Sequence, residues 1–226
     1  YQITAQTRAL SSIKLEVPVI PSTFYCVGLN YADHIVKMAA KKGIEPSFPQ
    51  QPDVGYRTVN ALIAHGETVI MPPDSSEIQY EGELVVVIGK RTKNVSKEEA
   101  LNCVFGFTIG NDVSERVWQK SDRTLWRAKN TDTFKPMGPW IETDVDLDQL
   151  ETRVSVNRNE QVTFPTNNML FGVETYISTI SKYATLYPGD VLWMGTDGIP
   201  SNLESGDVVD IEISGIGTLS NPFQKE

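Results

Sequence analysis

The stretch YEGELVVVIG at residues 80–89 contains an unbroken aliphatic run, LVVVI, that ends at a glycine. Successive side chains of a β-strand point to opposite faces, so both faces of this strand are apolar. A strand of that kind is covered on both sides, which predicts a sheet enclosed within the fold. Glu81 and Glu83 precede the aliphatic run and share one face, about 7 Å apart along the strand.

The remainder of the chain is rich in segments that favour strands. Short runs of valine and isoleucine alternate with Gly, Pro, Asn and Asp, which is typical of β-structure. We predict short strand pieces in residues 1–20, a hairpin in 61–73, and further strands at 22–30, 105–110, 139–145, 152–164, 190–200 and 206–223. A β-rich α+β fold follows, either a sandwich, a roll or a barrel with peripheral helices.

Three segments carry helix signals. Residues 30–43 begin with Asn30 as a possible cap and end at Gly43, with lysines in the last turn. Residues 96–105 open with a capping-box pattern from Ser96 to Glu99. A third helix is expected from residue 173 onward. The Pro-rich stretch at 43–57 predicts an irregular surface loop.

The composition excludes some partners. A formal net charge of -9 gives no basic footprint for nucleic acid or an anionic membrane. We see no membrane-spanning run and no signal peptide. Cys26 and Cys103 lie among apolar neighbours, as free thiols do in a reducing compartment, so a cytoplasmic location is expected. The sequence starts at Tyr1 rather than Met, which leaves a preceding targeting segment open.

Two interpretations of the glutamate pair are possible. Glu81 and Glu83 are solvated at the strand's entrance, or they lie inside, where mutual repulsion calls for a cation. Asp112 favours the second interpretation, because it follows another apolar strand, FGFTIG, at a Gly-Asn turn. If the two strands are neighbours, three carboxylates meet and suit Mg²⁺ or Mn²⁺. With His34 and His65 as the only histidines, a structural zinc site is poorly supported.

Several motifs in a fixed order resemble the fumarylacetoacetate hydrolase family over nearly the whole chain. They are FYCVGLNYADH at 24–34, YEGELVVVIGK at 80–90, GNDVSER at 110–116, K-x-x-D-T-F at 129–134 followed by PMGPW, GTDG at 195–198 and ESGDVVDIEISGIGTLSNPF at 204–223. The resemblance implies a mixed β-roll or barrel-like catalytic domain over residues 21–226, usually dimeric. Residues 1–20 would then be the remnant of an N-terminal region.

The resemblance also implies a chemistry. Family members act on small 2-oxo and 1,3-diketo acids by hydrolytic C–C cleavage, decarboxylation or isomerisation. The metal, Mg²⁺ or Mn²⁺, would be held by Glu81, Glu83 and Asp112 and would stabilise an enolate. Hydrolysis of an acylpyruvate is the leading expectation, with decarboxylation or isomerisation as the alternative. A non-catalytic metal-binding relative is a further alternative.

A local excess of positive charge accompanies these motifs. Between residues 116 and 129 the chain carries five cationic side chains against one acid, which suits an anionic substrate. The resemblance assigns substrate contacts to Arg116, Gln119 and Thr196. It assigns Lys129 a catalytic role at the developing charge.

Two positions depart from the family pattern. His34 matches a histidine that activates water, but where hydrolytic members carry a glutamate one helical turn later, this chain has Lys37, which cannot accept a proton. Glu45 is a possible substitute. Where relatives have an F-x-K-P element, this chain has Arg57, whose planar fork favours bidentate carboxylate binding, and we expect it to contact substrate.

Overall fold

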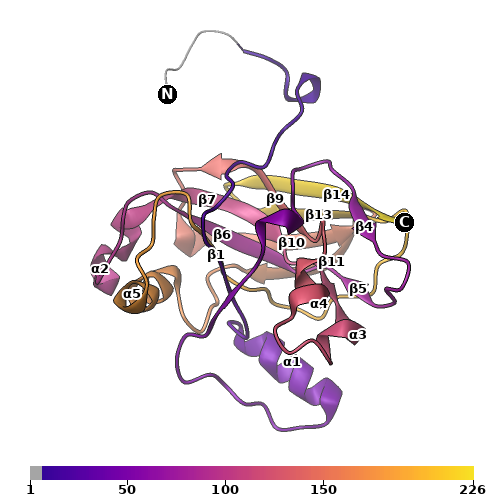
Figure 1. The fold of residues 1–226 in the computed structure, drawn as a ribbon, viewed down its shortest axis with the longest axis horizontal. Helices are drawn as coiled ribbons and strands as arrows, with labels where there is room; N and C mark the ends of the chain where they lie inside the picture. The colour runs from indigo at the N-terminus through magenta and orange to yellow at the C-terminus, as the bar shows by residue number, and fades with distance from the viewer. Residues whose placement is uncertain (1–6) are drawn as a thin grey trace.

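Two curved β-sheets form the body of the computed structural model, which describes residues 7–226 (Figure 1). The seven-stranded sheet has the order β2-β1-β12-β6-β7-β9-β3. Its strands are β1 (Phe24–Val27), β2 (Val54–Tyr56), β3 (Leu62–Ile63), β6 (Gly82–Ile88), β7 (Val104–Asn111), β9 (Lys135–Glu142) and β12 (Val191–Trp193).

The five-stranded sheet packs against one face of the first and has the order β11-β10-β13-β14-β4. Its strands are β4 (Val69–Met71), β10 (Glu151–Val156), β11 (Asn159–Pro165), β13 (Val208–Ile213) and β14 (Gly217–Lys225). A small ribbon pairs β5 (Ile78–Gln79) with β8 (Ser114–Glu115).

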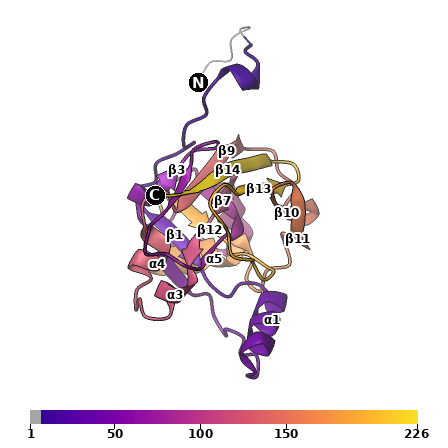
Figure 2. The same cartoon turned by 90° about the vertical axis from the view of Figure 1, so that its right-hand side faces the viewer.

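Short helices lie around the sheets (Figure 2). They are α1 (Ala32–Lys42), α2 (Lys97–Ala100), α3 (Arg116–Gln119), α4 (Trp126–Asn130) and α5 (Val173–Tyr183), with 3-10 turns at Leu10–Ser12, Val59–Ala61, Leu101–Cys103 and Leu147–Gln149. None of the helices described is long and apolar enough to span a bilayer. The predicted β-rich α+β class with peripheral helices is therefore confirmed.

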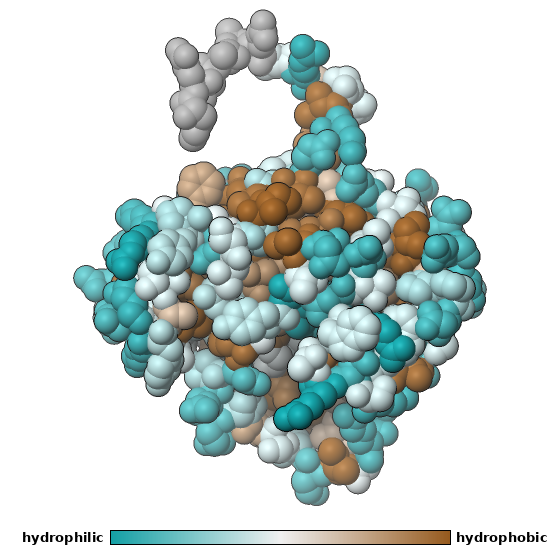
Figure 3. Space-filling model, in the orientation of Figure 1, coloured by the Kyte–Doolittle hydropathy of each residue, from teal (hydrophilic) through white to brown (hydrophobic). Residues whose placement is uncertain are grey.

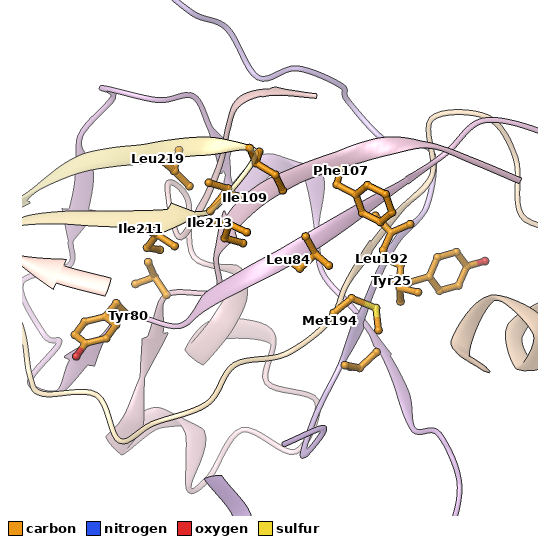
Figure 4. Packing of buried hydrophobic residues seen from close by; sticks show 14 of the residues in the cluster. Tyr25, Tyr80, Leu84, Phe107, Ile109, Leu192, Met194, Ile211, Ile213 and Leu219 are labelled. Atoms are coloured by element: carbon orange, nitrogen blue, oxygen red, sulfur yellow. The ribbon is translucent and has the colours of Figure 1, made fainter. Parts of the chain in front are cut away.

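The strand quoted first lies at the centre of the larger sheet and is buried along its whole length. On one face Leu84 and Val86 join the main core between the two sheets, in the same buried cluster as Ile211 and Ile213 of β13 (Figure 4). On the other face Val85 and Val87 belong to a second apolar cluster. Enclosure on both sides is thus what the aliphatic run predicted.

β6 and β7 pair antiparallel, with Gly82 opposite Asn111 and Leu84 opposite Ile109. Gly110 of β7 leaves room for the ring of Trp193 from β12, because a Cβ there would lie 2.6 to 2.8 Å from ring atoms of Trp193. The pairing brings the entrance of β6 beside the exit of β7, and the amide of Asp112 donates to the carbonyl of Glu81 at 2.9 Å.

Several local predictions were wrong. The described part of residues 1–20 contains a 3-10 turn and no strand, while residues 1–6 lie outside the described range. The expected hairpin in 61–73 does not form, because β3 pairs with β9 and β4 pairs with β14 in the other sheet. Each of these two short strands pairs with a longer strand that is distant in sequence, rather than with the other.

The helix caps also differ in part from prediction. Tyr31, not Asn30, precedes α1. The Asn30 side chain instead bonds the backbone of Phe171 and Met194 and so ties three segments together. Gly43 ends the helix in the left-handed conformation, as predicted. Ser96 precedes α2 without a side-chain capping bond.

Candidate metal and substrate site

Three carboxylates meet at the entrance of β6 and the exit of β7. Ligand oxygens of Glu81, Glu83 and Asp112 lie within 4.8 Å of one another, and all three side chains are buried. Glu81 and Glu83 come from alternate positions on one face of the chain at β6, while Asp112 follows β7 directly. The antiparallel pairing of two rigid central strands fixes this arrangement.

Asp112 is surrounded by cations. Arg57 donates to both of its oxygens, from Nε to Oδ1 at 3.0 Å and from Nη2 to Oδ2 at 2.9 Å. Lys129 donates to Oδ2 at 2.6 Å, and Lys135 Nζ lies 2.9 Å from Oδ1. Burial alone raises the pKa of Asp112, but the three cations outweigh it and hold that pKa well below its ordinary 3.8.

Glu81 is paired as well. Lys129 Nζ donates to its Oε2, and Arg116 Nη2 donates to its Oε1 at 2.6 Å. Burial raises the pKa of Glu81, and the two cations reverse that effect and lower it. Arg116 is in turn held by Gln79 at 2.7 Å and by Gln119 at 2.9 Å. Gln119 therefore reaches the carboxylates through Arg116.

Glu83 has the least compensation of the three. The backbone amide of Gly195 donates to its Oε2 at 2.9 Å, and no cation forms an ion pair with it among residues 7–226. Burial, and then repulsion from Asp112 and Glu81, raise its pKa well above the ordinary 4.5. A buried carboxylate facing two others fits a site that receives a cation. The all-oxygen donor set suits a hard divalent ion.

Lys135 is a member of this cluster that the sequence analysis missed. Its side chain is fully buried at the start of β9 and donates to the carbonyls of Val113 and Phe134 at 2.9 and 2.8 Å. Burial lowers its pKa to about 8, although attraction to Asp112 opposes the change. The only signal in the sequence was a lysine directly after K-x-x-D-T-F, inside an apolar strand.

Hydrogen bonds tie the segment carrying Arg57 to the one carrying Lys129. Asn130 accepts from the amide of Thr58 at 2.9 Å, and Asn60 donates to Asp132 at 2.7 Å. Two cations from distant parts of the sequence are thereby held against the same carboxylate.

The remaining predicted residues gather at the GTDG turn. His34 Nδ1 lies 2.7 Å from the carbonyl of Gly198, and Lys37 Nζ lies 3.7 Å from Asp197. The Thr196 hydroxyl donates to the carbonyl of Asp197 at 3.3 Å. The turn begins at Gly195, whose amide donates to Glu83, so it adjoins the carboxylates. Neither His34 nor Thr196 has a polar contact with the three carboxylates, and their roles stay predictions. Glu45 is exposed and forms no ion pair with His34 among the described residues.

Comparisons with known proteins identify relatives of this chain. The model of the fumarylacetoacetate (FAA) hydrolase C-terminal family matches residues 23–224. Protein Rv2993c of Mycobacterium tuberculosis is 39% identical over 99% of this chain and 83% of its own. Oxaloacetate tautomerase YisK of Bacillus subtilis is 37% identical over 94% of this chain and 74% of its own.

A solved structure shares the fold. The 2-hydroxyhepta-2,4-diene-1,7-dioate isomerase from Mycobacterium marinum superposes with a TM-score of 0.88 at 37% identity, covering 100% of this chain and 83% of that one. The family match extends over nearly the whole chain and includes the strands that carry the three carboxylates. The chain therefore belongs to the fumarylacetoacetate hydrolase family.

Proposed function

We propose that this protein is a divalent-metal-dependent enzyme that interconverts the keto and enol forms of a small 2-oxo dicarboxylic acid such as oxaloacetate. Glu81, Glu83 and Asp112 would hold Mg²⁺ or Mn²⁺. The bound ion would polarise the 2-oxo group and stabilise the negative charge that develops on its oxygen. A relative and a structural neighbour named tautomerase and isomerase support this choice over hydrolysis.

The observation that carries the proposal is the environment of His34. Hydrolysis needs a base that activates water, and a carboxylate partner stabilises the imidazolium that forms. Here the ring faces a carbonyl, that of Gly198, and the residue one turn later, Lys37, pairs with Asp197. A carbonyl fixes the ring with a proton on Nδ1 and leaves Nε2 as an acceptor. The imidazolium that water activation produces would therefore lack a carboxylate partner, whereas a keto–enol shift needs no activated water.

The cations of the site would receive the substrate. Arg116 and Lys129 lie beside the carboxylates in half-buried and buried positions and would attract the two negative charges of a dicarboxylate. Lys129, which donates to Glu81 and Asp112, would stabilise the charge that develops on the substrate. Thr196 lies in the GTDG turn that His34 contacts, and its hydroxyl would bond a substrate carboxylate.

One assay separates the candidate reactions. With Mg²⁺ present, oxaloacetate tautomerisation is followed by the loss of enol absorbance, decarboxylation by pyruvate formation, and hydrolysis by cleavage of acetylpyruvate. We expect the parent to accelerate tautomerisation most. Lys37→Glu, which restores a carboxylate near His34, should gain hydrolysis, whereas Lys41→Glu on the same helix should not. Hydrolysis as the parent's principal activity would refute the proposal and restore the acylpyruvate hydrolase prediction.

We further propose a homodimer that forms through the outer face of the seven-stranded sheet. Half-buried Val17, Val19, Leu62 and Ile141 cover the second apolar cluster there, and Ile20 is 65% exposed. An apolar patch is visible at the base of the N-terminal segment (Figure 3). Patches of this kind mark protein–protein contacts. Light scattering should give a dimer mass that Ile20→Asp reduces and Leu101→Asp, on another exposed surface, does not. A monomeric parent would refute this assembly.

A further inference from the structure

The guanidinium of Arg57 is bonded within the protein, although we expected it to contact substrate. Its side chain is only 7% exposed, and both of its bonds to Asp112 are short, at 2.9 and 3.0 Å. A third donor, Nη1, bonds the carbonyl of Tyr56 at 3.0 Å. The planar fork is thus largely engaged within the protein, and a substrate carboxylate could bind it only by displacing Asp112.

The hydrogen bonds from Arg57 to Asp112 affect the proposed cation site. A divalent ion takes carboxylate lone pairs, and Arg57 already occupies lone pairs on both oxygens of Asp112. Its fixed positive charge also repels a second cation at close range. Lys129 and Lys135 contact the same carboxylate, so Asp112 would keep two cationic partners if Arg57 were neutral.

We infer that Arg57 is a positioning residue that acts through Asp112 as an internal counter-ion, competing with the divalent metal and weakening its binding. This inference rests on the proposed metal-dependent function. Arginine rather than lysine at this position matters, because the guanidinium makes two contacts with the carboxylate where a lysine would make one. The chain therefore holds its metal less tightly than a lysine-bearing equivalent would.

The test is a Mn²⁺ titration of metal-free protein without substrate, with free Mn²⁺ counted by electron paramagnetic resonance. We expect Arg57→Gln to lower the Kd at least tenfold, about 1.4 kcal/mol, and Arg57→Lys to lower it about threefold, since it keeps the charge but loses the fork. Arg153→Gln is the matched control, because Arg153 pairs with surface glutamates on β10 and β13; its Kd should equal the parent's.

If Arg57 only held Asp112 in place, its substitution would weaken Mn²⁺ binding, because a loosened Asp112 would be a poorer ligand. Equal or weaker Mn²⁺ binding by Arg57→Gln, or weaker binding by Arg57→Lys should the glutamine variant not fold, overturns the inference. At saturating Mn²⁺ the KM for oxaloacetate should change less than about threefold, and a tenfold rise with unchanged metal affinity would make Arg57 a substrate contact instead. A parent that binds no Mn²⁺ at millimolar concentration overturns the proposed function as well.

Discussion

Replacing Glu83 by glutamine should stabilise the metal-free protein and remove its response to metal. Glu83 is 2% exposed and faces two other carboxylates whose ligand oxygens lie within 4.8 Å. Glutamine has nearly the same shape and can still accept the bond from the amide of Gly195. The substitution therefore removes a buried negative charge without creating a cavity.

The size of the effect follows from the separations. At 4.8 Å and an effective dielectric constant near 20, each carboxylate repulsion costs about 3.5 kcal/mol. Lys129, which contacts both neighbours of Glu83, offsets much of this, and partial protonation of Glu83 limits the rest. We expect a net gain of about 2 kcal/mol for Glu83→Gln without metal, which corresponds to about 4–8 °C in Tm for a chain of this size.

Saturating metal should reverse the order of stability. At a concentration about 100-fold above its Kd, an ion that binds only the folded state adds about 2.7 kcal/mol. The parent should gain that amount, and the variant, which lacks one ligand, should gain almost nothing. The assay is thermal unfolding in EDTA and in excess Mg²⁺, with exposed Glu160→Gln as the control. A Glu83→Gln variant that melts below the parent in EDTA would show that Glu83 already has adequate compensation in the folded protein.

Two further predictions concern packing and thiol chemistry. Gly110→Ala should lower the stability by about 1–3 kcal/mol through overpacking, because its Cβ would lie 2.6 to 2.8 Å from the Trp193 ring. Gly28→Ala is the control and should leave the Tm nearly unchanged, because a Cβ there would have nothing within 4 Å. Equal melting temperatures of the two variants would contradict the close contact. Iodoacetamide at pH 8 should label Cys103 and spare Cys26 in the native protein, since burial raises the pKa of Cys26 to about 12 and leaves about one thiolate in ten thousand. Mass spectrometry after brief labelling decides this, and equal labelling of both cysteines would mean that β1 opens readily.

The sequence predicts best where the signal lies within one strand. The aliphatic run of β6 identified a strand covered on both faces, and a turn after β7 placed Asp112 at its end. Both inferences depend on alternation along a strand, which a sequence displays directly. Pairings between distant segments are not displayed in this way. β3 and β4 lie close in sequence but join different sheets, and the Asn30 side chain bonds residues more than 140 positions away.

The same limit applies to the site. The carboxylates were predictable from residue type, whereas the partners of the cations were not. Arg57 was expected to face substrate, yet it binds Asp112 across 55 positions of sequence. Lys135 was overlooked, because a lysine within a strand ordinarily reaches solvent, and only the fold shows that it is fully buried beside an aspartate.

The charges of the site bear on how an acidic protein would bind the anionic substrate proposed above. Three carboxylates are accompanied by four cationic side chains, those of Arg57, Arg116, Lys129 and Lys135. With all seven groups ionised, the metal-free cluster carries a single net positive charge, so its attraction for a dicarboxylate is modest. A divalent ion would give it a clear positive excess in a buried, low-dielectric setting, where attraction is strong. We therefore expect oxaloacetate, and the unreactive dianion oxalate, to bind much more tightly with metal than without it, although the whole chain carries a net charge of -9. Calorimetric titration of oxalate with and without Mg²⁺ measures that dependence, and equal affinity in both conditions would contradict the charge argument.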